Sequence, residues 1–382
     1  MSKPDTTARA TVTVDSKKPS STPSTTAAPR PQPVPGTGPG GPGGRAAPHP
    51  AAAHPPAAHP AAEHAPAAPQ PAAHPVAGDA RRRRIDGLLR HSPLQPVFRA
   101  LSSRRLAVLA YHGIDDPTAF TAQMERLVRT ASPVSLGELE RCVAEGRPLP
   151  PRSVLVTFDD GDRSVLTHGL PVLARLRIPA AAFVVTELIG TEQPFWWSEA
   201  AYLAARGGTA QALSGCPPQH AVGRLKTLPD ADRRRSLQEL RATAGTRAPR
   251  QAQLGSTDLT ELRAAGVAIG NHTHSHPCLD RCADATVRTE VAEAHRLLTG
   301  WLGEAPTAFA YPNGNRDERT EALLGELGYR LGFLFNHRHD ALLPPDPLRI
   351  NRLRINSDTT RHRFDTILSG LHPAVHRIRG GC

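Results

Sequence analysis

The sequence predicts an α/β protein whose folded part is an irregular (β/α) barrel of about seven strands, preceded by a disordered N-terminal tail. Three observations support this fold class. Short apolar runs rich in β-branched residues alternate with helical stretches from residue 105 onward. Polar residues follow directly after several of these runs, as they do at the carboxyl ends of parallel strands. Residues 1–80 consist mostly of Pro, Ala, Ser, Thr, Gly and His, and cannot bury enough apolar surface to fold.

The strands and helices of this pattern follow in a regular order. Asp116 and Pro117 form a good helix start, while Ser135 and Asp284 are expected to cap two later helices. The expected strands are Arg105–Gly113, Val154–Phe158, Ala180–Thr186, Val267–Gly270, the run 308–314, Leu331–Phe335 and Leu348–Ile355. The expected helices begin at Asp116, run from Ser135 to Gly146, pass through Leu170–Leu176, and cover Leu259–Ala265, Ala285–Leu302 and Leu323–Leu327.

Composition divides the chain into four parts. We expect a disordered tail over 1–80, a basic linker or amphipathic segment over 81–104, a folded domain over 105–356 and a C-terminal tail over 357–382. Within the domain, residues 192–257 replace the regular alternation with a polar, arginine-rich and largely helical sequence. We therefore interpret this stretch as an insertion on the scaffold.

The chain is strongly basic, with a net charge of +11 and a pI of about 10.2. Part of the excess lies in Arg81–Arg84. Either this cluster belongs to an amphipathic segment that contacts an anionic membrane surface, or it is a solvated entry to the domain. The chain has no recognised nucleic-acid-binding module and no basic face with interleaved aromatic residues, so we expect no nucleic-acid partner.

Targeting signals are not evident in the sequence. The N-terminal residues contain no apolar stretch that resembles a secretory signal, and no window approaches the roughly 18 apolar residues of a membrane-spanning helix. The five cysteines lie at irregular spacing, and we expect them to be reduced thiols. These features predict a cytoplasmic protein, peripheral to a membrane if Arg81–Arg84 contact lipid.

Two adjacent carboxylates, Asp159 and Asp160, end the strand that begins at Val154 and are followed by Gly161. Neighbouring residues at a strand end point to opposite sides, so we do not expect the two carboxylates to bind one ion in the same way. We expect one to bind a metal ion and the other to take a proton from an attacking water molecule. A turn that simply ends the strand is the structural alternative.

Three histidines follow a second short apolar strand about a hundred residues later. His272 and His276 stand four residues apart, which places both on one side of a helical turn or tight loop, and His274 would face elsewhere. Two carboxylates and two or three imidazoles can hold one borderline metal ion. The combination is the outline of a metal-assisted hydrolase.

Four segments together resemble the ordered motifs of the polysaccharide deacetylases, carbohydrate esterase family 4 with its NodB-homology domain. They are Tyr111-His112, Thr157–Gly161, His272–Pro277 and Phe309–Gly314, and the similarity spans roughly residues 106–355. The resemblance implies an irregular β/α barrel that hydrolyses the N-acetyl group of an amino sugar. It also implies one divalent metal ion, usually zinc.

The resemblance assigns roles to particular residues. It implies that Asp159 is the general base and that Asp160, His272 and His276 are the metal ligands. It places the loop that contains Tyr311 and Asn313 in the substrate pocket, with a backbone N–H near Asn313 donating to the oxyanion.

The sequence also departs from the family pattern. Ala310 occupies the position at which many members carry an arginine that orients the catalytic aspartate. The usual leucine-flanked histidine that acts as general acid is also missing, and His337, His339 and His372 are the candidates to replace it.

These departures leave competing functions open. A deformylase or an O-acetyl esterase would keep the fold and change the acyl group. A catalytically silent carbohydrate-binding module is the alternative from a different class, although a module that only binds would not need Asp159. The prediction is a metal-dependent hydrolase acting on carbon–nitrogen bonds of an N-acetylated amino-sugar or glycan substrate.

Overall fold

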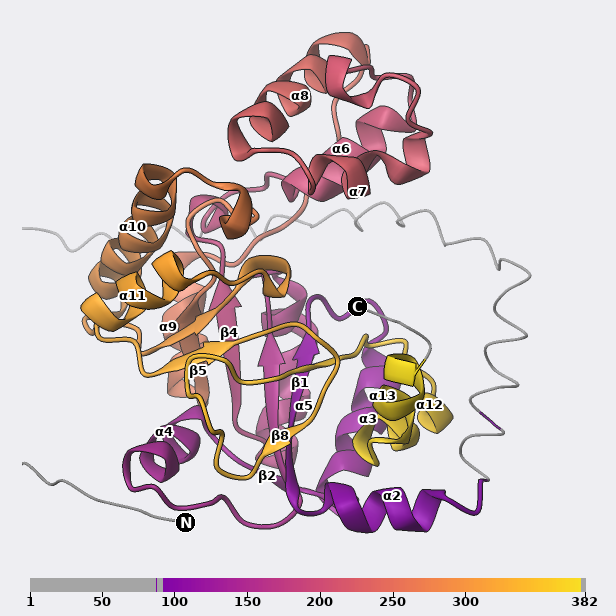
Figure 1. The fold of residues 1–382 in the computed structure, drawn as a ribbon, viewed down its shortest axis with the longest axis vertical. Coiled ribbons are helices and arrows are strands. Elements are labelled where there is room, and N and C mark those ends of the chain that lie inside the picture. The colour runs from indigo at the N-terminus through magenta and orange to yellow at the C-terminus, as the bar shows by residue number, and fades with distance from the viewer. Residues whose placement is uncertain (1–86, 88–91, 379–382) are drawn as a thin grey trace, which may run out of the picture. The chain divides into compact units, whose positions relative to one another are not determined.

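A computed structural model describes residue 87 and residues 92–378 of the chain (Figure 1). The tail predicted over residues 1–80 and the cluster Arg81–Arg84 lie outside the described residues, and so does Cys382. No helix in the described part of the chain is long and apolar enough to cross a bilayer.

Parallel strands form a curled sheet in the order β7-β6-β5-β4-β3-β1. Residues 350–354 close this sheet, because Ile350 pairs with Phe333 of β7 and Leu353 pairs with Leu109 of β1. The predicted barrel of about seven strands is therefore confirmed for the described residues. The strands are β1 (Arg105–Tyr111), β2 (Ser132–Pro133), β3 (Ser153–Phe158), β4 (Ala180–Val184), β5 (Val267–Asn271), β6 (Ala308–Ala310), β7 (Leu331–Phe333), β8 (Asp340–Ala341) and β9 (Leu353–Arg354).

Helices cover the outside of the barrel and begin largely where capping residues predict. Asp116 and Ser135 accept hydrogen bonds from the first turns of α3 and α4. Asp284 is instead the first residue of α10, after Ala283, so the expected cap is wrong by one position. The helices are α2 (Gln95–Ser102), α3 (Pro117–Thr130), α4 (Leu136–Ala144), α5 (Leu170–Leu176), α6 (Trp196–Ala204), α7 (Ala221–Leu225), α8 (Asp230–Thr243), α9 (Ser256–Ala264), α10 (Asp284–Leu302), α11 (Glu318–Glu326), α12 (Arg361–Leu368) and α13 (Leu371–Ile378).

Alternate strand residues divide the core into two layers. Val108 and Leu155 belong to the cluster inside the barrel, whereas Leu109 and Val156 pack under the outer helices. The two faces of β1 and β3 are thus both apolar, as expected of strands buried on each side. This alternation decides which way each strand-end residue points.

Two helical groups lie outside the regular repeat. Helices α6, α7 and α8 build a small core of their own around Leu203, Leu225 and Leu240. They belong to the stretch interpreted as an insertion and lie beyond the carboxyl ends of the strands (Figure 1). Residues 357–378, expected to be part of a tail, contain α12 and α13, and α12 packs against α2 and α3.

Candidate active site

Asp159 and Asp160 follow β3 directly, and both side chains are buried. Asp159 continues the inward-facing series of β3 and therefore points into the barrel. Asp160 would face outward, but its φ of 75° turns the chain, and both carboxylates come to lie beside His272. The local backbone thus resolves the difficulty that adjacent residues normally point apart.

Arg352 is the partner of Asp159, and sequence reasoning missed it. Its Nη1 and Nη2 atoms donate to the two Asp159 oxygens at 2.7 and 2.8 Å, and its Nε atom donates to the Leu334 carbonyl at 2.7 Å. The arginine is fully buried inside the barrel. The sequence signal was an arginine at an inward position of the strand Leu348–Ile355, because a buried arginine requires a carboxylate.

The same ion pair controls the charge of the aspartate. Burial by itself raises the pKa of Asp159, but Arg352 and then His272 outweigh it and lower the pKa below its ordinary value. Asp159 is therefore a carboxylate at neutral pH. The arginine that holds Asp159 comes from the strand that closes the barrel.

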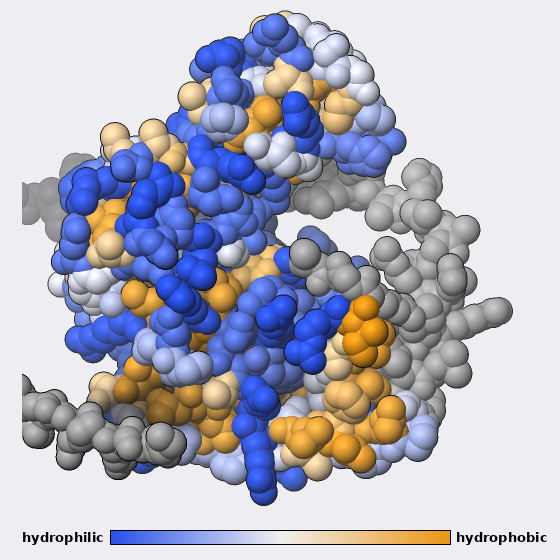
Figure 2. Space-filling view, viewed as in Figure 1, coloured by the Kyte–Doolittle hydropathy of each residue, from blue (hydrophilic) through white to orange (hydrophobic). Residues whose placement is uncertain are grey.

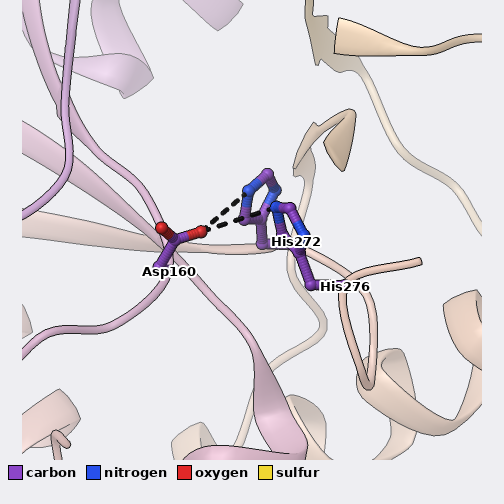
Figure 3. Close-up of side chains that lie close together, drawn as sticks. All are labelled: Asp160, His272 and His276. Carbon is purple, nitrogen blue, oxygen red and sulfur yellow. Dashed lines mark ion pairs between the residues drawn. The ribbon is translucent and has the colours of Figure 1, made fainter. Parts of the chain in front are cut away.

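His272 and His276 present their Nε2 atoms to Asp160 (Figure 3). The distances from Asp160 Oδ1 to these atoms are 3.4 Å and 3.6 Å. The His272 Nδ1 atom lies 2.8 Å from the Ala310 carbonyl, which favours the tautomer with its proton on Nδ1. Nε2 then carries a lone pair and can bind a cation.

A second set of contacts fixes the loop of residues 272–277, which carries the three histidines. Glu290 of α10 accepts hydrogen bonds from the backbone N–H and the hydroxyl of Ser275 at 2.7 and 2.6 Å. Arg234 of α8 donates to both Ser275 and Glu290, so the insertion is tied to this loop. His274 turns away from the carboxylates, with its Nδ1 atom 3.0 Å from Thr186 Oγ1.

Asp160, His272 and His276 form the group of described residues that fits a metal ion. A tetrahedral ion with bonds of about 2.0–2.1 Å separates its ligand atoms by roughly 3.3 Å, close to the two Asp160 distances. Asp160 Oδ1 is also buried without a hydrogen-bond partner, an arrangement that a cation would satisfy. The donor set therefore fits zinc or a similar ion. Cys278 and Cys282 are not part of the group.

Strained backbone is concentrated at this site. Seven non-glycine residues of the described chain have a positive φ, and four of them are Asp160, Thr273, His276 and Asn313. Such conformations cost on the order of 1–3 kcal/mol each and persist where surrounding contacts impose them. The loop is therefore not the helical turn that the four-residue spacing of the histidines allowed.

The loop after β6 contributes backbone and one side chain to the site. The Tyr311 side chain is fully buried and its hydroxyl donates to the Leu348 carbonyl, so only its backbone is available to a substrate. Gly314 has a φ of 78°, and a Cβ there would lie 2.6 Å from the Phe335 nitrogen. Asn313 Oδ1 accepts a 2.5 Å hydrogen bond from Lys226, the residue after α7. The insertion thus reaches the site through Lys226.

The three histidines named as candidate general acids have partners elsewhere. His337 Nε2 lies 2.9 Å from His372 Nδ1, and His337 Nδ1 accepts from the Arg354 backbone N–H. His339 Nε2 lies 3.2 Å from the Leu368 carbonyl.

His112, at the end of β1, is close to the carboxylates instead. Burial raises the pKa of Asp160, but His272 and then His112 outweigh it and lower the pKa. The His112 ring is half-buried and packs edge-on against Phe335 at 5.4 Å between ring centroids. The end of β1 therefore brings this ring to the same end of the barrel as the two carboxylates.

The fold is that of an α/β barrel, with an acidic and histidine-rich cluster at the carboxyl ends of its strands. Residues 146–332 match the polysaccharide deacetylase family. This match confirms the resemblance that the motifs of the sequence predicted.

Solved structures with a similar chain fold include three bacterial proteins. The deacetylase PplD of Streptococcus pyogenes, solved in complex with acetate, is 18% identical over 69% of this chain and 98% of its own, with a TM-score of 0.49. IcaB from Ammonifex degensii is 21% identical over 70% and 96%, with a TM-score of 0.49. The deacetylase domain of BpsB from Bordetella bronchiseptica is 20% identical over 66% and 97%, with a TM-score of 0.46. No curated protein matches the chain.

Proposed function

We propose that this protein is a metal-dependent hydrolase that removes the N-acetyl group from an amino-sugar substrate. One observation carries the proposal. An aspartate held by a buried arginine, Asp159, lies next to the Asp160–His272–His276 group in a chain that matches the polysaccharide deacetylase family. A protein that only binds sugar gains nothing from a buried carboxylate kept charged beside a cation site.

The residues of the cluster divide the chemistry between them. Asp160, His272 and His276 would hold one divalent ion, with zinc the best match to two imidazoles and a carboxylate. When bound, such an ion supplies a Lewis acid that polarises the acetyl carbonyl and acidifies water. Asp159 accepts the proton of the attacking water, and the two hydrogen bonds from Arg352 keep its carboxylate in one orientation.

The remaining steps concern the oxyanion and the leaving amine. The backbone N–H of Asn313 would donate to the carbonyl oxygen as negative charge develops on it. When the carbon–nitrogen bond breaks, the amine nitrogen needs a proton, and we assign its delivery to His112. It replaces His337, His339 and His372 in this role because their ring nitrogens bond to one another and to the backbone.

The insertion supplies the surroundings of an amino-sugar ring. Trp197 is half-buried, packs 4.4 Å from the His276 ring and stacks on Phe195. An indole beside the reacting group offers an apolar surface to one face of a sugar, while Lys226 and Asn313 offer polar contacts to hydroxyl groups.

Acetate release tests the proposal directly. The purified protein is incubated with N-acetylglucosamine oligomers, with matched N-formyl and O-acetyl sugars, before and after exhaustive chelation. We expect acetate from the N-acetyl substrate, loss of activity on chelation, and recovery with zinc. Preferential release of formate, or of acetate from the ester, would identify the deformylase or esterase instead. Sugar binding without any turnover would establish the silent binding module.

A further inference from the structure

A second cavity lies at the opposite end of the barrel from the candidate active site. It has a volume of about 210 Å³ and opens between the amino ends of β1 and β3 and the carboxyl ends of α2, α3 and α12. Ala107, Ser153 and Val154 form its buried floor. Five arginines surround it, namely Arg99, Arg105, Arg126, Arg129 and Arg152.

The positive charge around this cavity is only partly balanced. Arg126 pairs with Asp365 at 2.8 Å, whereas no carboxylate of the described chain forms an ion pair with the other four arginines. The ends of three helices carry about half a negative charge each, so together with Asp365 they offset roughly half of the arginine charge. The cavity therefore attracts an anion, and forked guanidinium groups suit a phosphate in particular.

The helix beside the cavity also exposes apolar side chains. Leu94, at the N-cap of α2, is 54% exposed, Val97 is 54% exposed and Leu101 is 62% exposed. Their spacing places them along one face of α2, while Ser102 and Arg99 of the same helix line the cavity. Apolar residues gather on this side of the molecule in Figure 2, where α2, α12 and α13 lie in Figure 1.

We propose that this cavity binds the phosphate of an anionic phospholipid and that the apolar face of α2 enters the membrane surface next to it. A site for a free anion would need only the arginines. The exposed apolar strip beside them fits a ligand whose charged head group is joined to acyl chains. The proposal concerns the amino end of the barrel and does not depend on the reaction at the other end.

Vesicle binding tests this site in the full chain. The protein is sedimented with phosphatidylcholine vesicles that contain or lack phosphatidylglycerol, both in the parent and with Arg81–Arg84 changed to glutamine. We expect binding only to the anionic vesicles. Each basic residue near such a surface is worth about fivefold in affinity, so Arg105→Gln/Arg152→Gln should weaken binding by roughly thirtyfold. Val97→Ser/Leu101→Ser should weaken it about tenfold or more.

A matched control removes the same charge far from the cavity. Arg206→Gln/Arg247→Gln alters two exposed arginines of the insertion and should change vesicle binding less than twofold. Circular dichroism confirms that each variant is folded, and the Val97 and Leu101 changes affect exposed positions only. Equal losses in the cavity and control variants would overturn the proposal, as would a parent that does not bind. Saturable binding of inorganic phosphate at these arginines without vesicle binding would also overturn it, and would leave a pocket for a soluble anion.

Discussion

Two groups of neighbouring histidines in this protein differ in the charge that surrounds them. His272 and His276 face Asp159 and Asp160 at the carboxyl ends of β3 and β5. His337 follows β7, whereas His372 and His376 belong to α13, and the three rings pack on one another. The first group has carboxylates among its polar neighbours, whereas the charges that act on His337 are all positive, those of His372, His376, Arg354 and Arg363.

The pKa values separate His272 from the other histidines, because burial and then the charge of His272 lower the pKa of His276 to about 3. Burial lowers the pKa of His272, but Asp159 and then Asp160 outweigh it and raise the pKa above its ordinary value. Burial lowers the pKa of His337 to about 3, and His372, His376 and Arg354 act in the same direction. Neutral imidazoles can bind a metal ion without a carboxylate, so the two groups are separated by their geometry. Among the described residues, Asp160, His272 and His276 bring one ligand atom each to within 4.8 Å of one another, and the three rings of the second group do not.

Removing a histidine from each group should separate them most sharply. We expect His276→Ala to reduce bound metal from one ion per chain to nearly none and to lower activity by a thousandfold or more, because the Lewis acid contributes several kcal/mol. His337→Ala should retain both. Elemental analysis and acetate release measure the two quantities. Equal metal loss in the two variants would show that the assignment of ligands is wrong.

Asp159 and Asp160, the carboxylates beside the first group, should differ from each other in their effects on metal binding and on kcat. We expect Asp159→Asn to keep the metal and to lose about a hundred- to ten-thousand-fold in kcat, the usual range for a general base. Asp160→Asn should instead weaken metal binding. A fully metallated Asp159→Asn protein with nearly parental turnover would refute the role of Asp159 as base.

Arg352 allows a test of whether the orientation of the Asp159 carboxylate matters for activity. We expect Arg352→Lys to lower kcat by about ten- to a hundredfold with little change in KM, because an ammonium cannot hold both Asp159 oxygens. Arg349→Lys is the matched control. Arg349 also donates from two nitrogens to one carboxylate, that of Glu321, but this pair is partly exposed and far less critical. Similar kcat values for the two variants would contradict a positioning role for Arg352.

The sequence predicted the strands, the barrel and the residues of the candidate cation site because each of these depends on local pattern. Asp160 and His272 follow apolar runs directly, and parallel strands bring such positions to one edge. Arg352 could not be paired with Asp159 in the same way. The two residues are 193 positions apart, and only the closure of the barrel brings them together.

Two further features escaped prediction for related reasons. Lys226 follows a helix of only five residues, in a stretch whose apolar spacing gives no sign of where it packs. The helices α12 and α13 are eight residues each and are stabilised by packing on other elements rather than by their own propensity.

The smallest expected effect concerns the stability of the second histidine group. An unfolded histidine takes up a proton near pH 6.5, whereas folded His337 does so only near pH 3. Because the unfolded chain binds more protons between these values, this residue's contribution to stability is present above pH 6.5 and is lost as the pH falls toward 3.

His337→Asn should therefore make the free energy of unfolding, measured by urea titration, less dependent on pH between 4 and 7. The slope of that dependence should fall by up to one proton. Asparagine tolerates the φ of 58° at this position, and activity at neutral pH should stay within about threefold of the parent. An unchanged slope would mean that His337 titrates normally in the folded protein, and a large loss of turnover would return it to the candidates for the proton donor.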